Sequence, residues 1–262
     1  MWYSMKFKIE EIAKQYHNGT VVIVGNGPRL VTMPGKDAAF QRFKHIAEQR
    51  SKGIYKDINE YEQPKALVHR IDDSPHPLWT INGAWTYHPK STMGFMMDDH
   101  KFHRPETHPQ PEWYDNLMKE AQIPIMTSKY YPQYPPLVEY PIREIIKKFK
   151  TSYFGETVDY MIALAVYFGV KKLIFIGCDY QLHDRFPGER ASTEYWIGKV
   201  EAMGVECDAS HSENLMKPSG WEPHFHPQFY GYAKDDFPVS EQEISNLIKG
   251  DQGGPKDRRK AG

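Results

Sequence analysis

A run of mostly β-branched residues at positions 20–24 (Thr-Val-Val-Ile-Val) is followed at once by a turn made of Gly25, Asn26, Gly27 and Pro28. A continuous apolar run of this kind predicts a strand that is buried on both faces, as strands of a parallel sheet are. A second strong strand is predicted at 173–177, directly after a segment, 157–168, that predicts a buried helix. The chain therefore has to place at least one strand–helix–strand arrangement around a common sheet.

The remaining segments extend this alternation. Helices are predicted at 6–17, 38–50, 113–121, 142–150 and 192–203, and further strands at 66–71, 78–81, 93–97, 123–126 and 205–207. Residues 130–141 are rich in Tyr and Pro, and we expect them to form a long ordered loop rather than a helix or a central strand. Strands that alternate with helices predict an α/β fold with a Rossmann-like, mostly parallel sheet flanked by helices. We expect a single domain over residues 1–249 and a disordered tail at 250–262.

Charge and composition exclude some classes of protein. Lys and Arg number 33 against 34 Asp and Glu, a balance that argues against a protein that coats DNA, although a local basic groove for nucleic acid stays open. The two cysteines, Cys178 and Cys207, are expected to be reduced and buried on neighbouring strands, as in a reducing cytosol. The first residues lack the pattern of a signal peptide, and no segment is long and apolar enough to span a bilayer. We therefore expect a cytoplasmic protein.

Polar residues follow three of the predicted strands. The turn at 25–28 follows the first strand, Asp98 and Asp99 follow the strand at 93–97, and Asp179, Tyr180 and Gln181 follow the strand at 173–177. Because ligands of open parallel sheets bind outside the carboxyl ends of the strands, we expect these places to converge on one cleft. The glycines let the backbone approach a phosphate or a ribose, and the Asn26 amide can both donate and accept. A plain tight turn is an equally good interpretation of the spacing.

Other side chains offer chemistry with an ordinary alternative beside it. Asp98, Asp99 and His100 have the groups of a divalent-metal site, but a polar loop fits the same residues, and nothing in the pattern requires a metal. Arg190 could bind a phosphate beside a helix that begins at Ser192, or form a surface ion pair. His183 could act as a base at neutral pH, or be a solvated loop histidine.

Several of these segments together resemble the glycosyltransferase family 42 sialyltransferases, which use a CMP-activated sugar. The resemblance lies in residues 22–28 (Val-Ile-Val-Gly-Asn-Gly-Pro), 81–84 (Ile-Asn-Gly-Ala) and 157–180, which end in Gly177-Cys178-Asp179-Tyr180. The same segments also resemble the 6-hydroxymethylpterin pyrophosphokinase (MptE-like) family and uncharacterised tailed-phage proteins. A phage-encoded chain would act in the cytoplasm of its host.

The resemblance implies roles for individual residues. Asn26 and Asn82 would hold the ribose and base of the nucleotide, and Asp98 or Asp99 would contact the donor sugar. Thr157 would lie near the donor's carboxylate or phosphate, and Tyr180 and Gln181 near a phosphate-binding tyrosine. Arg29 replaces the family's usual serine and adds a cation, and His183 is the histidine nearest to the place of the family's catalytic one.

These observations lead to a transferase that binds a nucleotide or nucleotide-sugar donor and moves a glycosyl or diphosphoryl group to an unidentified acceptor. His183 would be its base, with Asp99 as a second catalytic group, and Arg29 and Arg190 would contact phosphate. Three alternatives remain: a pterin pyrophosphokinase-like phosphotransferase, a metal-dependent phosphohydrolase built on Asp98, Asp99 and His100, and a nucleotide-binding protein without catalysis.

Overall fold

The computed structural model describes residues 6–25, 74–86, 88, 90–97, 116, 118–178, 180, 187–212, 214–216, 240 and 242–243. The chain divides into two units, residues 1–216 and 217–262, and the sheet lies in the first. In the second unit only Ser240, Gln242 and Glu243 are described. The predicted boundary at residue 249 stays a prediction.

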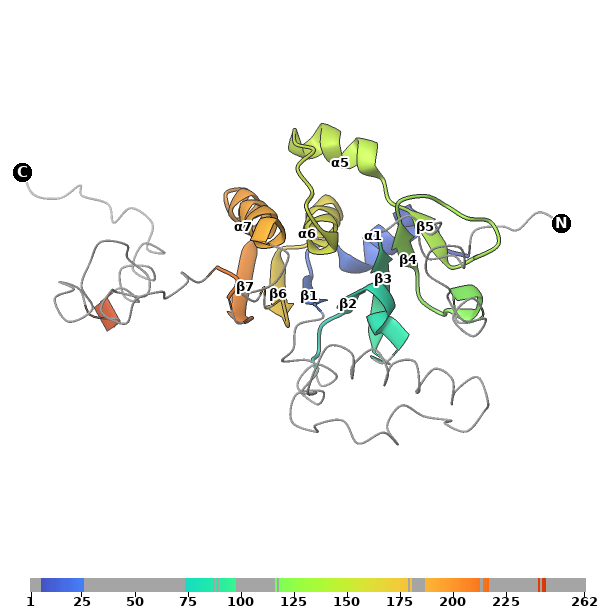
Figure 1. Cartoon of the computed structure of the whole chain (residues 1–262), viewed down its shortest axis with the longest axis horizontal. Coiled ribbons are helices and arrows are strands. Elements are labelled where there is room, and N and C mark those ends of the chain that lie inside the picture. The colour runs from blue at the N-terminus through green and yellow to red at the C-terminus, as the bar shows by residue number, and fades with distance from the viewer. Residues whose placement is uncertain are drawn as a thin grey trace, which may run out of the picture. The chain divides into compact units, whose positions relative to one another are not determined.

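Seven parallel strands form one sheet in the order β5-β4-β3-β2-β1-β6-β7 (Figure 1). The strands are β1 Thr20–Val24, β2 Leu78–Ile81, β3 Ser91–Met96, β4 Ile125–Thr127, β5 Leu137–Glu139, β6 Lys172–Ile176 and β7 Glu206–His211. The α-helices with described bounds are α1 Ile9–Tyr16, α5 Ile142–Phe149, α6 Thr157–Tyr167 and α7 Pro187–Glu201, and a 3-10 helix, η2 Asn82–Thr86, follows β2. The predicted Rossmann-like α/β class is confirmed.

Alternation along the strands divides the core between the two faces of the sheet. Val21 and Ile23 of β1, with Leu173 and Phe175 of β6, join a large cluster that also contains the apolar faces of α1, α5, α6 and α7. These four helices gather on the same side of the strands in Figure 1. The alternate residues of β1, Val22 and Val24, pack on the opposite face of the sheet with Leu78. Every residue of β1 except Thr20 is buried, as expected for a strand covered on both faces.

Helix α6 is apolar nearly all round because it lies at the centre of this core. Its residues from Val158 to Val166 are buried except Tyr160, and full burial of each large aliphatic side chain stabilises the fold by about 1.5–3 kcal/mol. Gly169, with a φ of 87°, provides the left-handed turn from the helix towards β6. No helix in the described ranges is long and apolar enough to cross a membrane.

Two sequence predictions are wrong in detail. Residues 130–141 contain a strand, β5, which is tolerated beside Pro135 and Pro136 because it is only three residues long and lies at the edge of the sheet. Helix α7 begins at Pro187 rather than after Ser192, and a proline in the first turn of a helix loses no hydrogen bond. The predicted helix at 38–50 and strand at 66–71 lie outside the described residues.

Candidate functional site

The order of the strands reverses direction between β1 and β6, at the centre of the sheet. The chain continues from β1 to β2 on one side and from β6 to β7 on the other, while β1 and β6 pair in register with Val24 opposite Ile176. Loops that leave neighbouring strands in opposite directions open a crevice at the carboxyl edge, and this is where open α/β sheets bind ligands. Since every strand is parallel, the ends of β2 and β3 lie at the same edge.

The first residues beyond the two central strands are packed against each other. The Gly25 amide donates to the Ile176 carbonyl at 2.9 Å. A Cβ atom on Gly25 would lie 2.4 Å from the carbonyl oxygen of Gly177. Gly177 itself has a φ of 67°, in the left-handed region that favours glycine. Both glycines are therefore required by the backbone, and they bring the two turns together at the reversal point.

Two further residues at this edge have left-handed backbone angles although they are not glycine. Asn82, exposed and directly after β2, has a φ of 49°, and Tyr180, four residues after β6, has a φ of 39°. Asparagine tolerates this conformation, but tyrosine rarely adopts it, and such residues concentrate at ligand sites. The Asn214 amide donates to the Tyr180 carbonyl at 3.2 Å and fixes the turn.

The starts of α6 and α7 meet beside Tyr180 in a partly buried polar network (residues Gly155, Glu156, Asp159, Tyr180, Ser192 and Thr193), of which Asp159, Ser192 and Thr193 are fully buried. The Thr193 hydroxyl lies 2.7 Å from Glu156 Oε1, 2.8 Å from Asp159 Oδ1 and 3.0 Å from the Tyr180 hydroxyl. Asp159 Oδ2 accepts from the backbone N–H of Gly155 at 2.7 Å and of Glu156 at 3.2 Å. Glu156 and Asp159 also form a capping box at the first turn of α6, so the network ties two helices to the turn after β6.

Burial governs the acidity of this network. Desolvation raises the pKa of Glu156 to about 8; repulsion from Asp159 and Glu189 adds to this shift, and the contact with the Thr193 hydroxyl opposes it. Burial also raises the pKa of Asp159, but its contacts with the Ser192 and Thr193 hydroxyls and the hydrogen bonds from two backbone amides oppose that shift. Two backbone amides therefore favour the ionised form of Asp159, whereas desolvation favours the protonated form of Glu156.

Arg190 lies in the first turn of α7, because that helix begins at Pro187. Its Nε donates to Glu194 Oε1 at 2.7 Å, and the same oxygen accepts from the Met216 amide at 2.9 Å. Ser192 is inside the helix, where its hydroxyl donates to the Glu189 carbonyl at 2.9 Å, and it is not the cap that the sequence predicts. The role of Arg190 as a phosphate contact stays a proposal.

Of the predicted site residues, the structure describes Gly25, Asn82, Thr157, Tyr180 and Arg190. Thr157 is the first residue of α6, and like Gly25, Asn82 and Tyr180 it lies at the end of the sheet where the strands finish. Nine predicted site residues lie outside the described part: Asn26, Gly27, Pro28, Arg29, Asp98, Asp99, Asp179, Gln181 and His183. The predicted metal residue His100 lies outside it as well.

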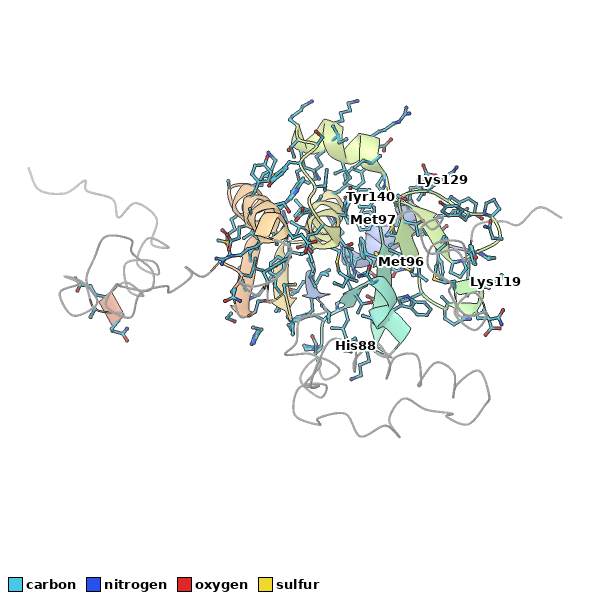
Figure 2. All side chains as sticks on the ribbon, viewed as in Figure 1. His88, Met96, Met97, Lys119, Lys129 and Tyr140 are labelled. Atoms are coloured by element: carbon cyan, nitrogen blue, oxygen red, sulfur yellow. The ribbon has the colours of Figure 1, made fainter. Side chains whose placement is uncertain are left out.

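The strand that leads to the predicted acidic pair is well defined. Met96 ends β3, and Met97 follows it and directly precedes Asp98; both methionines are labelled in Figure 2. Within the described ranges no three His, Cys, Asp or Glu side chains are grouped closely enough to hold a metal ion. Both cysteines are free thiols: Cys178 is buried just after β6, whereas Cys207 lies opposite Leu173 in β7 and is half-buried, so the prediction that both are buried holds only for Cys178. Burial raises the pKa of Cys207 to about 12.

Sequence reasoning missed the acids and the hydroxyl of the buried network. Glu156-x-x-Asp159 directly before an apolar helix has the spacing of a capping box, which is a detectable signal for a helix start. Thr193, by contrast, is separated from these acids by more than 30 residues (34 from Asp159), and no local pattern connects them. Only the packing of α7 on α6 brings the hydroxyl between the two carboxyl groups.

The fold and its central reversal point define a Rossmann-like α/β protein with its candidate site at the carboxyl ends of β1, β2 and β6. No protein-family model matches the sequence, and no curated protein sequence is similar to it. Two solved structures of the sialyltransferase CstII from Campylobacter jejuni are similar, both at 15% identity over 88% of this chain. The complex with cytidine-5'-monophosphate is covered over 99% of its chain with a TM-score of 0.40, and the complex with CMP-3FNeuAc over 98% with a TM-score of 0.38. A likeness this distant assigns no function to the chain.

Proposed function

We propose that the chain binds a nucleotide or a nucleotide-sugar at the carboxyl edge of β1, β2 and β6 and transfers a glycosyl group from it. The observation that carries this proposal is the contact between the turns after β1 and β6 at the reversal point of the sheet, where Gly25 and Gly177 admit close backbone approach. The Gly25 N–H already donates to the Ile176 carbonyl, so a phosphate at this point would be bound by amides further along the two turns.

Asn82 supplies the second element of the proposal. It is exposed, follows β2 directly, and is held with a left-handed backbone that directs its side chain independently of the strand's alternation. An amide can donate and accept at once, as recognition of a base edge or a ribose requires. With Asn26, which precedes Gly27 in the turn after β1, it would form the nucleoside end of the site.

The chemistry rests on residues beyond the described strands. His183 would remove a proton from the acceptor, Asp99 would assist at the donor sugar, and Arg29 and Arg190 would neutralise phosphate. Transfer of a diphosphoryl group in the manner of a pterin pyrophosphokinase, metal-dependent phosphohydrolysis at Asp98, Asp99 and His100, and nucleotide binding without catalysis are the other functions that these residues allow.

Calorimetry with CMP, UDP, GDP and ATP tests the proposal, and cytidine nucleotides come first because the similar structures were determined with them. Asn82→Gly is the informative variant, because glycine tolerates the left-handed backbone and only the amide is lost. We expect it to weaken nucleotide binding about tenfold or more, the loss of one or two hydrogen bonds to a ligand. Lys172→Gln, at the amino end of β6, is the matched control and should bind as the wild type does. Absence of binding for all four nucleotides would remove the proposal.

Incubation of bound nucleotide-sugar with and without Mg²⁺ separates the alternatives. Release of free nucleotide that is abolished by His183→Ala supports transfer or hydrolysis through a protein base. Release that needs the metal and is lost in Asp98→Asn supports the phosphohydrolase. A nucleotide that binds and stays unchanged supports the non-catalytic protein.

A further inference from the structure

The Thr193 hydroxyl lies between two carboxyl groups and has only one hydrogen to share with them. One hydroxyl carries one hydrogen, yet Thr193 Oγ1 lies within 2.8 Å of an oxygen from each of two carboxyl groups, Glu156 and Asp159. If both acids were ionised, one of these short oxygen–oxygen contacts would contain no hydrogen atom and would be repulsive. A second proton is therefore part of the arrangement.

That proton belongs to Glu156. Asp159 is fully buried and already accepts from the Gly155 and Glu156 amides, which favours its ionised form. Thr193 then donates its hydrogen to Asp159, and the Glu156 carboxyl donates to the Thr193 oxygen. The Tyr180 hydroxyl completes the set as a second donor to Thr193, whose oxygen has two lone pairs.

We propose that neutral Glu156 is a positioning residue for the ligand site: its carboxyl O–H donates a hydrogen bond to Thr193, which helps to hold Tyr180 and the first turns of α6 and α7 in place. The role of Glu156 in a ligand site rests on the proposed function. The protonation of Glu156 does not depend on any ligand. Loss of the proton would leave two carboxylates, one buried and one partly buried, facing one hydroxyl. The network would then open, and Tyr180 would lose the hydroxyl contact with Thr193 and keep only the backbone tie to Asn214.

The ionisable groups around Glu156 favour its protonated form. Asp159 and Tyr160 come from α6, Glu189 from α7 and Tyr180 from the turn after β6, and none of these groups is a cation. Arg190 of the same turn of α7 pairs with Glu194. The closeness of Glu156 to Asp159 and Glu189 disfavours its ionisation, as burial does.

The direct test is the titration of Glu156 in the full-length protein without ligand. Infrared difference spectra should show a protonated carboxyl band at pH 6 that disappears as the pH passes about 8 and is absent in Glu156→Gln. Glu144→Gln, which removes an exposed carboxyl of α5, is the control and should leave the band unchanged. A band that is already absent at pH 6 in the wild type would overturn the inference, whatever the protein binds.

The functional test uses the nucleotide that binds best in calorimetry. Wild-type affinity should fall about tenfold for each pH unit above the titration of Glu156, relative to Glu156→Gln, whose amide donates to Thr193 at every pH. Glu156→Ala should bind weakly throughout. Parallel pH profiles for wild type and Glu156→Gln would overturn the positioning role. If no nucleotide binds at all, the proposed function fails while the infrared result still decides where the proton resides.

Discussion

Gly25 and Gly177 meet at the reversal point of the sheet, where a methyl group on the first would lie 2.4 Å from the carbonyl oxygen of the second. This contact joins the turn after β1 to the turn after β6, the two segments between which an open α/β sheet binds its ligand. The contact is between backbone groups, so no rotation of a side chain can make room for a larger residue.

Gly25→Ala is therefore expected to destabilise the protein by about 1–3 kcal/mol or more, because the added methyl overpacks two backbones. Gly198→Ala is the matched control. Gly198 lies inside α7 with open space around its Cβ position, and alanine there should stabilise by about 0.5–1 kcal/mol. Denaturant unfolding of both variants measures the difference. Equal stabilities would contradict the close contact between β1 and β6.

Gly155→Ala tests the packing of α7 against the start of α6. A Cβ on Gly155 would lie 2.4 Å from Ser192 Oγ and 2.9 Å from Ser192 Cβ, so we expect a loss of about 1–3 kcal/mol. Ser192→Ala should restore part of this loss when combined with Gly155→Ala, since it removes the nearer atom. A double-mutant cycle by thermal unfolding gives the coupling, and additive effects would mean that the two residues do not touch.

Stability should fall as the pH rises through the range in which Glu156 is protonated only in the folded protein. The pKa of Glu156 is raised from 4.5 to about 8, so its contribution is complete below about pH 4.5 and is lost progressively up to about pH 8. The slope from this one group is at most about 1.4 kcal/mol per pH unit. Glu156→Gln removes it, so the melting temperature of the variant should rise relative to the wild type between pH 5 and 8. A constant difference across that range would argue against a buried neutral acid.

Thr193→Val should cost about 2–4 kcal/mol, because it keeps the shape of the side chain but leaves Glu156, Asp159 and Tyr180 facing a methyl group. Thr193→Ser keeps the hydroxyl and should cost about 1 kcal/mol, the loss of one methyl group. Urea titrations of the two variants provide the comparison. A serine variant as unstable as the valine variant would show that packing, and not hydrogen bonding, dominates at this position.

The central strands and the class of fold could be predicted from the sequence because their signals are local. The run at 20–24 became β1 with the same bounds, and the apolar segment at 157–168 became α6 with one residue fewer. The start of α7 was missed because Ser192 looks like a cap, whereas the actual start is a proline whose preference for a first helical turn is equally local but weaker.

The site was predictable only in part, for a physical reason. The place of Gly25 at the carboxyl edge could be predicted because it follows a recognisable strand, whereas Asn82 was named only through the resemblance. The pair Glu156–Thr193 could not, since its contact depends on how two helices pack. The need for glycine at position 25 was likewise invisible, because the atom that excludes a side chain belongs to Gly177.

Hydrogen–deuterium exchange of the protein with and without its best nucleotide tests most directly whether the ligand lies at the carboxyl edge of the central strands. The account predicts added protection in peptides that cover Gly25, Asn82 and Tyr180, at the ends of β1, β2 and β6. Peptides at the outer edge of the sheet, over residues 125–139 of β4 and β5, should exchange as before. Protection confined to that outer edge, with no change after β1 and β6, would contradict the account.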